Sequence, residues 1–197
     1  MDQFEYVMVL ISIIVGLGIA HILLGIGGII DRLAGEREPL ELSLAHAAWL
    51  LLTFGWLVLF WWWEYRFASR ISDWTVGLYF FLVLFAVTIF LMSVVLVPRS
   101  WDGVHSLKEY FLQRRVWFFG LWGFANILDL VDSYLKGGLT YILEEVGVLS
   151  SGIQLLAIPI AIIAIRTRNQ KFHSSISVMA MIWMYLSAFS VLPNLAL

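Results

Sequence analysis

Six apolar segments account for most of this chain, and each is about long enough to cross a lipid bilayer as a helix. The hydrocarbon core of a bilayer is about 30 Å thick and a helix rises about 1.5 Å per residue, so one crossing needs about 20 residues. We therefore expect an all-α, polytopic membrane protein whose residues 1–197 form one transmembrane domain. The predicted transmembrane helices cover residues 4–30, 42–63, 74–97, 116–135, 139–165 and 174–195.

Composition excludes soluble fold classes and several kinds of chemistry. Mean hydropathy is +0.90 and only 13% of the residues are charged, whereas soluble domains carry about 25%. Open sheets leave backbone groups unpaired in lipid, and these segments are apolar on all sides, so helices are favoured over a barrel. The chain has no cysteine, which removes disulfides and thiolate metal sites. No catalytic motif is present, so we expect no enzyme, and no loop is large enough to bind nucleic acid.

Basic residues predict the orientation of the chain. Positively charged loops stay in the cytoplasm, and most of the 12 Lys and Arg residues fall in the first, third and fifth loops. With six crossings, both termini then lie outside the cytoplasm. Tryptophans near the segment ends are typical of the aromatic belts at the two membrane interfaces. The basic residues in these three loops are Arg32, Arg37, Arg99, Lys108, Arg114, Arg115, Arg166, Arg168 and Lys171.

Polar side chains recur at helical spacing in the fourth and fifth segments. Steps of three or four residues put them on one face of each helix. The short turn Lys136-Gly137-Gly138 joins the two segments, so we expect them to be antiparallel neighbours. The fourth segment carries Arg115, Phe119, Trp122, Asn126, Asp129 and Ser133 on this face, and the fifth carries Glu144, Gly147, Ser151 and Gln154.

These two faces predict a pathway or binding site for a cation, a proton or a small polar solute, in a channel-like or transporter-like protein. Charged side chains within membrane segments are costly and are often functional. Asp129 and Glu144 would attract the charge, and amide and hydroxyl groups would replace its hydration. Alternatively, the acidic residues lie in interfacial water and the other polar groups hold helices together. The predicted pathway residues are Asn126, Asp129, Asp132, Glu144, Glu145, Ser151 and Gln154.

Two histidines offer a second hypothesis. His21 and His46 lie at similar predicted depths in the first and second segments, and two facing histidines can ligate a b-type haem or a metal. Alternatively, each histidine forms a hydrogen bond with a neighbouring helix. Apart from the haem hypothesis, we expect no cofactor. A third hypothesis is a non-catalytic sensor or assembly subunit, in which the polar hairpin serves only to join helices.

Glycines in the first segment favour close helix packing. Gly16 and Ala20 form a small-xxx-small pair, which lets helix backbones approach one another. Together with the small size of the chain, this pair predicts a homo-oligomer in the lipid bilayer.

Several short sequences carry a resemblance. They are Phe4-Glu5-Tyr6, the following Leu10–Ile14 and Gly16–Gly18, Arg114-Arg115-x-Trp117-Phe118-Phe119, and the region of Asp129. These resemble short polytopic inner-membrane proteins of bacteria to which no function is assigned. The resemblance implies a bacterial inner membrane and implies no activity, ligand or site.

Overall fold

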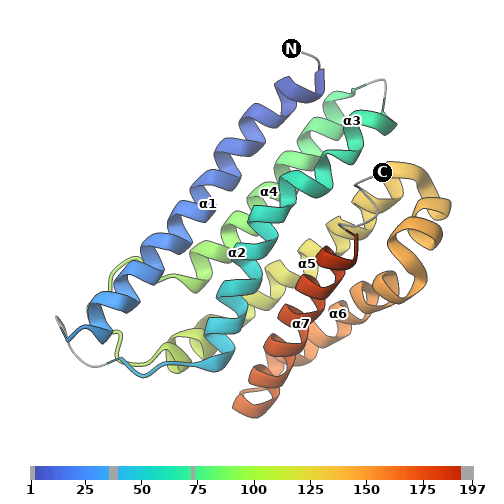
Figure 1. Ribbon diagram of the computed structural model, residues 1–197. Helices are drawn as coiled ribbons and strands as arrows, with labels where there is room; N and C mark the ends of the chain where they lie inside the picture. Colours follow the sequence, from blue (N-terminus) through green and yellow to red (C-terminus); the bar gives the residue numbers. More distant parts are fainter. Residues whose placement is uncertain (1–2, 36–39, 72–73, 192–197) are drawn as a thin grey trace.

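The chain folds into long helices (Figure 1). The structure is a computed structural model, and it describes residues 3–35, 40–71 and 74–191. Among these residues, extended backbone pairs only in an isolated bridge between Glu41 and Ser106. The all-α prediction is therefore confirmed. The elements are α1 (Gln3–Leu33), α2 (Leu44–Glu64), the short α3 (Arg66–Arg70), α4 (Val76–Leu96), α5 (Leu107–Tyr141), the π-helical turn η1 (Ile142–Gly147), α6 (Val148–Arg166) and α7 (Gln170–Val191).

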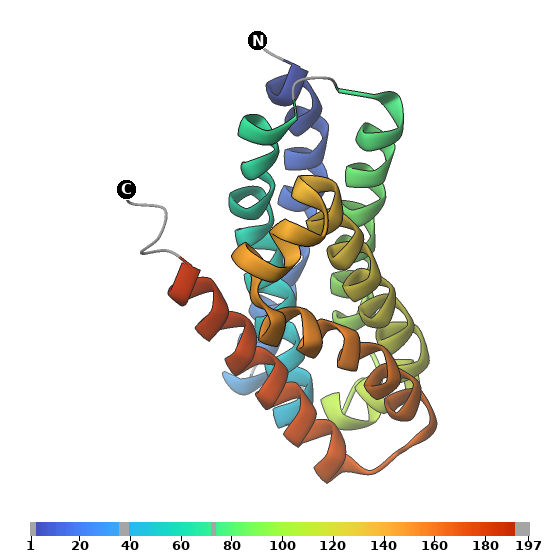
Figure 2. The same ribbon diagram turned by 90° about the vertical axis from the view of Figure 1, so that its right-hand side faces the viewer.

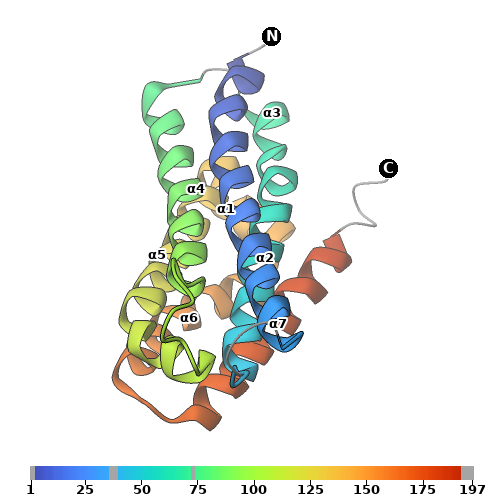
Figure 3. The same ribbon diagram turned by 90° about the vertical axis from the view of Figure 1, so that its left-hand side faces the viewer.

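Helices α1, α2 and α4 pack against one another, and the remaining helices are added at the side of this group. Figure 3 shows α1 in front, with α4 on one side of it and α2 on the other. Helix α5 packs on α4, α6 packs on α5, and α7 packs on α2, so that α6 and α7 lie on the face seen in Figure 2. Large side chains from α2, α4 and α5 fill the centre, including Trp49, Phe60, Phe85, Phe118 and Phe119.

Five helical segments are long and apolar enough to cross a membrane. The predicted fourth and fifth segments both fall within the segment Leu107–Arg166, which contains a kink where the backbone of Gly137 and Gly138 is not helical. The end of the predicted sixth segment, residues 192–195, lies outside the described residues. The five segments are Gln3–Leu33, Leu44–Arg70, Val76–Leu96, Leu107–Arg166 and Gln170–Phe189.

The chain reverses direction between α5 and α6, where the backbone departs from helical geometry at Gly137, Gly138 and Gly147. Gly138 (φ 68°) and Gly147 (φ 87°) have left-handed backbone conformations, which glycine adopts without strain. Beyond them, Arg115 Nε of α5 donates a hydrogen bond to the Ile165 carbonyl at the end of α6, at 3.1 Å. The predicted antiparallel contact of these helices is thus confirmed. Their connection is longer than the predicted Lys136-Gly137-Gly138 turn, since it includes η1.

The end of the bundle where α1 ends and α5 begins (Figure 1) carries most of the basic residues, and we call it the basic end. These residues are Arg32, Arg99, Lys108, Arg114, Arg115, Arg166, Arg168 and Lys171. Two loops meet there. Glu41 N donates to the His105 carbonyl at 2.8 Å, and Leu107 N donates to the Glu41 carbonyl at 2.9 Å. The side chain of Arg32, at the end of α1, donates to the carbonyl of Trp101. These bonds fix the loop between α4 and α5 against α1.

Gly28 allows this loop to approach α1, and its replacement gives a testable prediction. A methyl group at Gly28 would overlap the Trp101 indole, whereas nothing lies within 4 Å of the same position at Gly27. We expect Gly28→Ala to destabilise the protein by about 1–3 kcal/mol through overpacking. Gly27→Ala should be neutral or stabilising, by up to about 1 kcal/mol from helix propensity. Thermal unfolding in detergent measures both, and equal midpoints would contradict the packing of Trp101 on α1.

Candidate functional site

Three charged side chains are buried together at the end of the bundle opposite the basic end. Lys136 Nζ lies 3.3 Å from Glu64 Oε2 and also donates a hydrogen bond to Asp132 Oδ2. Each of the three residues is 5% exposed or less. We call Glu64, Asp132 and Lys136 the buried cluster. It joins α2 to α5 through an ammonium group held between two carboxylates.

Helix geometry explains how these side chains meet. Asp132 and Lys136 are one turn apart on α5, where side chains four residues apart are neighbours. Lys136 occupies the last regular turn before Gly137, and a cation is favoured at a helix C-terminus. Glu64 is the last residue of α2, a position that disfavours an anion, and the contact with Lys136 compensates for it. The Phe67 ring covers the cluster, with its centroid 4.8 Å from Lys136 Nζ.

A second layer of charged groups lies above the buried cluster. Arg66 donates to the Tyr141 hydroxyl at 3.0 Å and lies 3.5 Å from a Glu145 carboxylate oxygen. Arg70 donates to the same carboxylate, and its guanidinium carbon lies 4.8 Å from the centroid of the Tyr141 ring. Arg66, Arg70 and Glu145 are accessible to solvent, whereas Tyr141 is buried. Tyr141 is therefore the buried residue that the two arginines of this ionic layer contact.

The buried cluster carries one negative charge more than its positive charge when all three groups are ionised. Glu64 Oε2 and Asp132 Oδ1 are buried and accept no hydrogen bond from any described residue. An uncompensated charge away from water is costly, by several kcal/mol per ion in real proteins. Binding one proton or one small cation would neutralise the cluster. The arrangement is therefore suited to taking up and releasing a single positive charge.

Two of the predicted pathway residues connect α5 to α6. Asp129 accepts a hydrogen bond from the Gln154 side-chain amide. Asn126 and Ser151 instead bond within their own helical segments: the Asn126 amide donates to the Trp122 carbonyl at 2.8 Å, and the Ser151 hydroxyl to the Gly147 carbonyl at 3.1 Å. Asn126 and Ser151 therefore do not join helices through these bonds, whereas Asp129 and Gln154 form a contact between helices.

The predicted acidic residues have different surroundings. Asp132 belongs to the buried cluster, and Glu145 belongs to the ionic layer with Arg66 and Arg70. Glu144 is exposed on η1. The acidic residues of the predicted pathway are therefore divided between the buried cluster, an ion pair with two arginines and an exposed position on η1.

Packed aromatic rings lie at the end of the α5 polar face that is nearer the basic end. The Trp49 ring centroid lies 5.0 Å from those of Phe118 and Trp122 and 5.5 Å from that of Phe119. We call these four residues the aromatic layer. All four are buried, and Trp122 is one turn from Asn126 on α5. The polar groups of α5 therefore end against packed rings.

The two histidines of the cofactor hypothesis have unlike environments. His46 is buried, its Nε2 lies 2.8 Å from the Leu96 carbonyl oxygen, and its ring meets Tyr110 edge-on. Only Nδ1 of His46 would then be available to a metal. His21 is partly buried, and its Nε2 has no hydrogen-bond partner among the described residues. No group of three or more metal-ligating side chains occurs within the described ranges. The bis-His haem hypothesis remains a prediction.

Glu64 and Lys136 are the members of the buried cluster that sequence reasoning missed. Lys136 was assigned to a turn, although its spacing from Asp132 matches a helical ion pair. Glu64 follows a run of aromatic residues at a predicted interface, and nothing local indicates its partner.

Comparisons of the chain with protein-family models, with curated proteins and with solved structures found no match.

Proposed function

We propose that the protein binds a proton or a small monovalent cation at the buried cluster and passes it along the polar face of α5 and α6. The observation that supports this proposal is the contact of Glu64 and Asp132 with the single ammonium of Lys136, all three buried. Ionisable residues buried within membrane proteins are costly and characterise ion and proton pathways.

A line of polar groups on α5 supports a route away from the cluster. Lys136, Asp132, Asp129 and Asn126 follow at steps of three or four residues, and Asp129 also contacts Gln154 of α6. At about 1.5 Å rise per residue the line is roughly 15 Å long, or about half the hydrocarbon thickness. Carboxylates and amides at this spacing can exchange a proton or coordinate a cation along one helix face.

The aromatic layer favours a carrier over an open pore. It closes the polar line one turn beyond Asn126, and the rings of Trp49 and Trp122 are in contact there. A charge that reaches Asn126 crosses the remaining distance only when these rings move apart. Passage is then coupled to a change of helix packing, which is the behaviour of a transporter.

We further propose six crossings, with both termini outside the cytoplasm of a bacterial inner membrane, and a homo-oligomeric assembly. The reversal between Gly137 and Gly147 supports counting α5 and α6 as two crossings. The charge bias is consistent with this topology, because most basic residues lie at the basic end and positively charged loops remain cytoplasmic. The resemblance of short sequences to bacterial inner-membrane proteins supports the choice of a bacterial inner membrane.

Proton flux into liposomes tests the proposed function. The purified protein is reconstituted with a trapped pH-sensitive dye, and a potassium gradient with valinomycin supplies the driving force. We expect wild-type flux well above that of empty liposomes, and at least a tenfold loss in Glu64→Gln and in Asp132→Asn. Either substitution leaves Lys136 with one carboxylate partner, so the cluster stays paired and the fold is retained. What is lost is the additional charge that attracts the proton.

Asp31→Asn is the matched control, because Asp31 is an exposed carboxylate on α1 at the far end of the bundle. Its flux should equal that of the wild type. Parallel liposomes with a trapped sodium-sensitive dye separate the two ions: a signal from the pH-sensitive dye that persists when N-methylglucamine replaces external sodium identifies the proton, and a signal from the sodium-sensitive dye identifies sodium. Wild-type liposomes no more permeable than empty ones, or flux unchanged in both cluster variants, would reject the proposal.

A further inference from the structure

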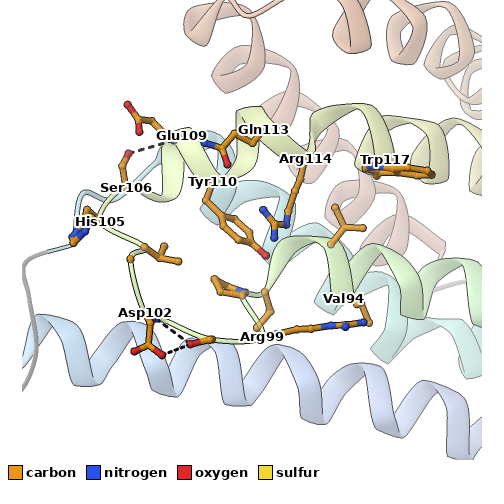
Figure 4. A pocket seen from close by; sticks show the side chains of 16 residues that line it. Val94, Arg99, Asp102, His105, Ser106, Glu109, Tyr110, Gln113, Arg114 and Trp117 are labelled. Carbon is orange, nitrogen blue, oxygen red and sulfur yellow. Dashed lines mark hydrogen bonds between the residues drawn. The ribbon is translucent and has the colours of Figure 1, made fainter.

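A pocket of about 580 Å³ opens at the basic end, far from the buried cluster (Figure 4). The end of α4, the loop that follows it and the first turns of α5 form its wall. This wall combines basic, aromatic and amide side chains with short aliphatic ones. Its polar and aromatic members include Arg99, His105, Tyr110, Gln113, Arg114 and Trp117.

Two arginines supply the positive charge of the pocket. The guanidinium carbon of Arg114 lies 4.1 Å from the centroid of the Tyr110 ring, a distance that holds the group by a cation–π interaction. Figure 4 shows Arg114 and Tyr110 reaching from α5 toward the loop that carries Arg99. Neither arginine forms an ion pair with a carboxylate within residues 3–35, 40–71 and 74–191. Their N–H donors are therefore available to an anion.

The carboxylates of the wall do not neutralise these arginines. Asp102 accepts a hydrogen bond from the Ser100 hydroxyl, and the Ser106 hydroxyl caps the start of α5 by accepting a hydrogen bond from the Glu109 backbone N–H at 3.3 Å. In Figure 4 both carboxylates lie at the edge of the pocket, away from Arg114. The N-terminal turn of α5 adds its positive dipole end to the same region. The centre of the pocket is thus suited to a negative group.

The side of the pocket toward the membrane segments is apolar. Val94 and Val95 of α4 belong to its wall, and Trp117 of α5 is 73% exposed at its margin. Exposed tryptophan at the end of a membrane helix is typical of the lipid headgroup level. A ligand with an anionic head and an apolar tail therefore matches the order of polar and apolar groups along the wall.

We propose that this pocket binds a phosphate group between Arg99 and Arg114, as the headgroup of an anionic phospholipid. Arginine forms paired hydrogen bonds with phosphate oxygens, and basic pockets between membrane helices on the cytoplasmic side bind anionic headgroups. The aliphatic wall of Val94 and Val95 receives the start of the acyl chain. This inference stands independently of proton or cation passage.

Native mass spectrometry of the detergent-solubilised protein tests the site. Added dioleoyl phosphatidylglycerol should form a one-to-one complex with the wild type. The double variant Arg99→Ala/Arg114→Ala should raise its dissociation constant at least tenfold. The control is Arg166→Ala/Arg168→Ala, which removes the same charge from exposed positions at the same end of the bundle. Its dissociation constant should stay within about twofold of the wild type, and thermal unfolding checks that both variants fold.

Two further arms distinguish the sources of the phosphate. Phosphatidylcholine carries the same phosphate without net charge and should bind more weakly than phosphatidylglycerol. Glycerol phosphate has no acyl chain: if it binds as tightly as the lipid and loses affinity in the pocket variant, a soluble phosphate ester is the ligand and the lipid assignment is wrong. Equal loss in the pocket and control variants, or no binding of either anion, would overturn the proposed site.

Discussion

Replacing Lys136 by methionine is expected to destabilise the protein by about 3–5 kcal/mol, because the change leaves two buried carboxylates without their cation. Methionine is similar in length and fills the same space beneath Phe67, so the effect reports the lost charge. We therefore expect the free energy of unfolding of Lys136→Met to be well below that of the wild type. Equilibrium unfolding in mixed micelles, followed by circular dichroism, measures the difference in free energy.

Neutralising the whole cluster provides the control for this result. In the triple variant Glu64→Gln/Asp132→Asn/Lys136→Met no group is charged, and replacing a buried ionic network by neutral groups of similar volume is often close to neutral. Its stability should return to within about 1–2 kcal/mol of the wild type, the remainder being the cost of imperfectly bonded amides. If Lys136→Met were as stable as the wild type, the ammonium would not be what joins α2 to α5.

Removing the Trp49 side chain should have an effect of similar size at the centre of the bundle. Trp49 has no measurable exposure and its ring meets Phe118, Phe119 and Trp122. Trp→Ala changes in a packed interior cost about 3–5 kcal/mol, through lost contacts and the cavity left behind. We expect about 3 kcal/mol, because Trp49 Nε1 is buried without a hydrogen-bond partner among the described residues and its removal costs no bond.

Two variants control the Trp49 experiment. Trp49→Phe keeps an aromatic ring and removes the N–H group, so it should recover most of the loss. Trp62→Ala removes the same side chain from a position on α2 that is 46% exposed, and it should change the free energy of unfolding by less than about 1 kcal/mol. Equal losses at Trp49 and Trp62 would show that the aromatic layer does not hold the bundle together.

Hydrophobic length alone predicts most of the helices. The predicted segment 4–30 lies within α1, and the segment 74–97 contains α4. The beginning of α5 was missed because residues 107–115 are too charged for an apolar window. A signal was nevertheless present: Ser106 followed three residues later by Glu109 is the pattern of a capping box, and Ser106 indeed accepts a bond from the Glu109 N–H.

The candidate site was only partly predictable, for a physical reason. Asp132 was selected as an acidic residue close to the polar face of the fourth segment, although the helical spacing that defines that face does not include it. The contact of Glu64 with Lys136 depends on how α2 meets α5, and no local spacing encodes it. The assignment of Lys136 to a turn also concealed its ion pair with Asp132. Sequence patterns therefore locate polar faces, whereas the pairing of charges between distant helices follows only from their packing.

The pairing of Glu64 with Lys136 has a consequence for biogenesis. Lys136 is synthesised after Glu64, and the delay is the time needed to add the residues between them. At about 5–20 residues per second this delay is roughly 4–14 s. Throughout that interval the α2 carboxylate has no cation to meet from α5. Newly synthesised α2 therefore keeps the Glu64 carboxylate in contact with water, and this carboxylate becomes buried only when the second half of the chain arrives. Completion of the bundle thus depends on translation reaching Lys136.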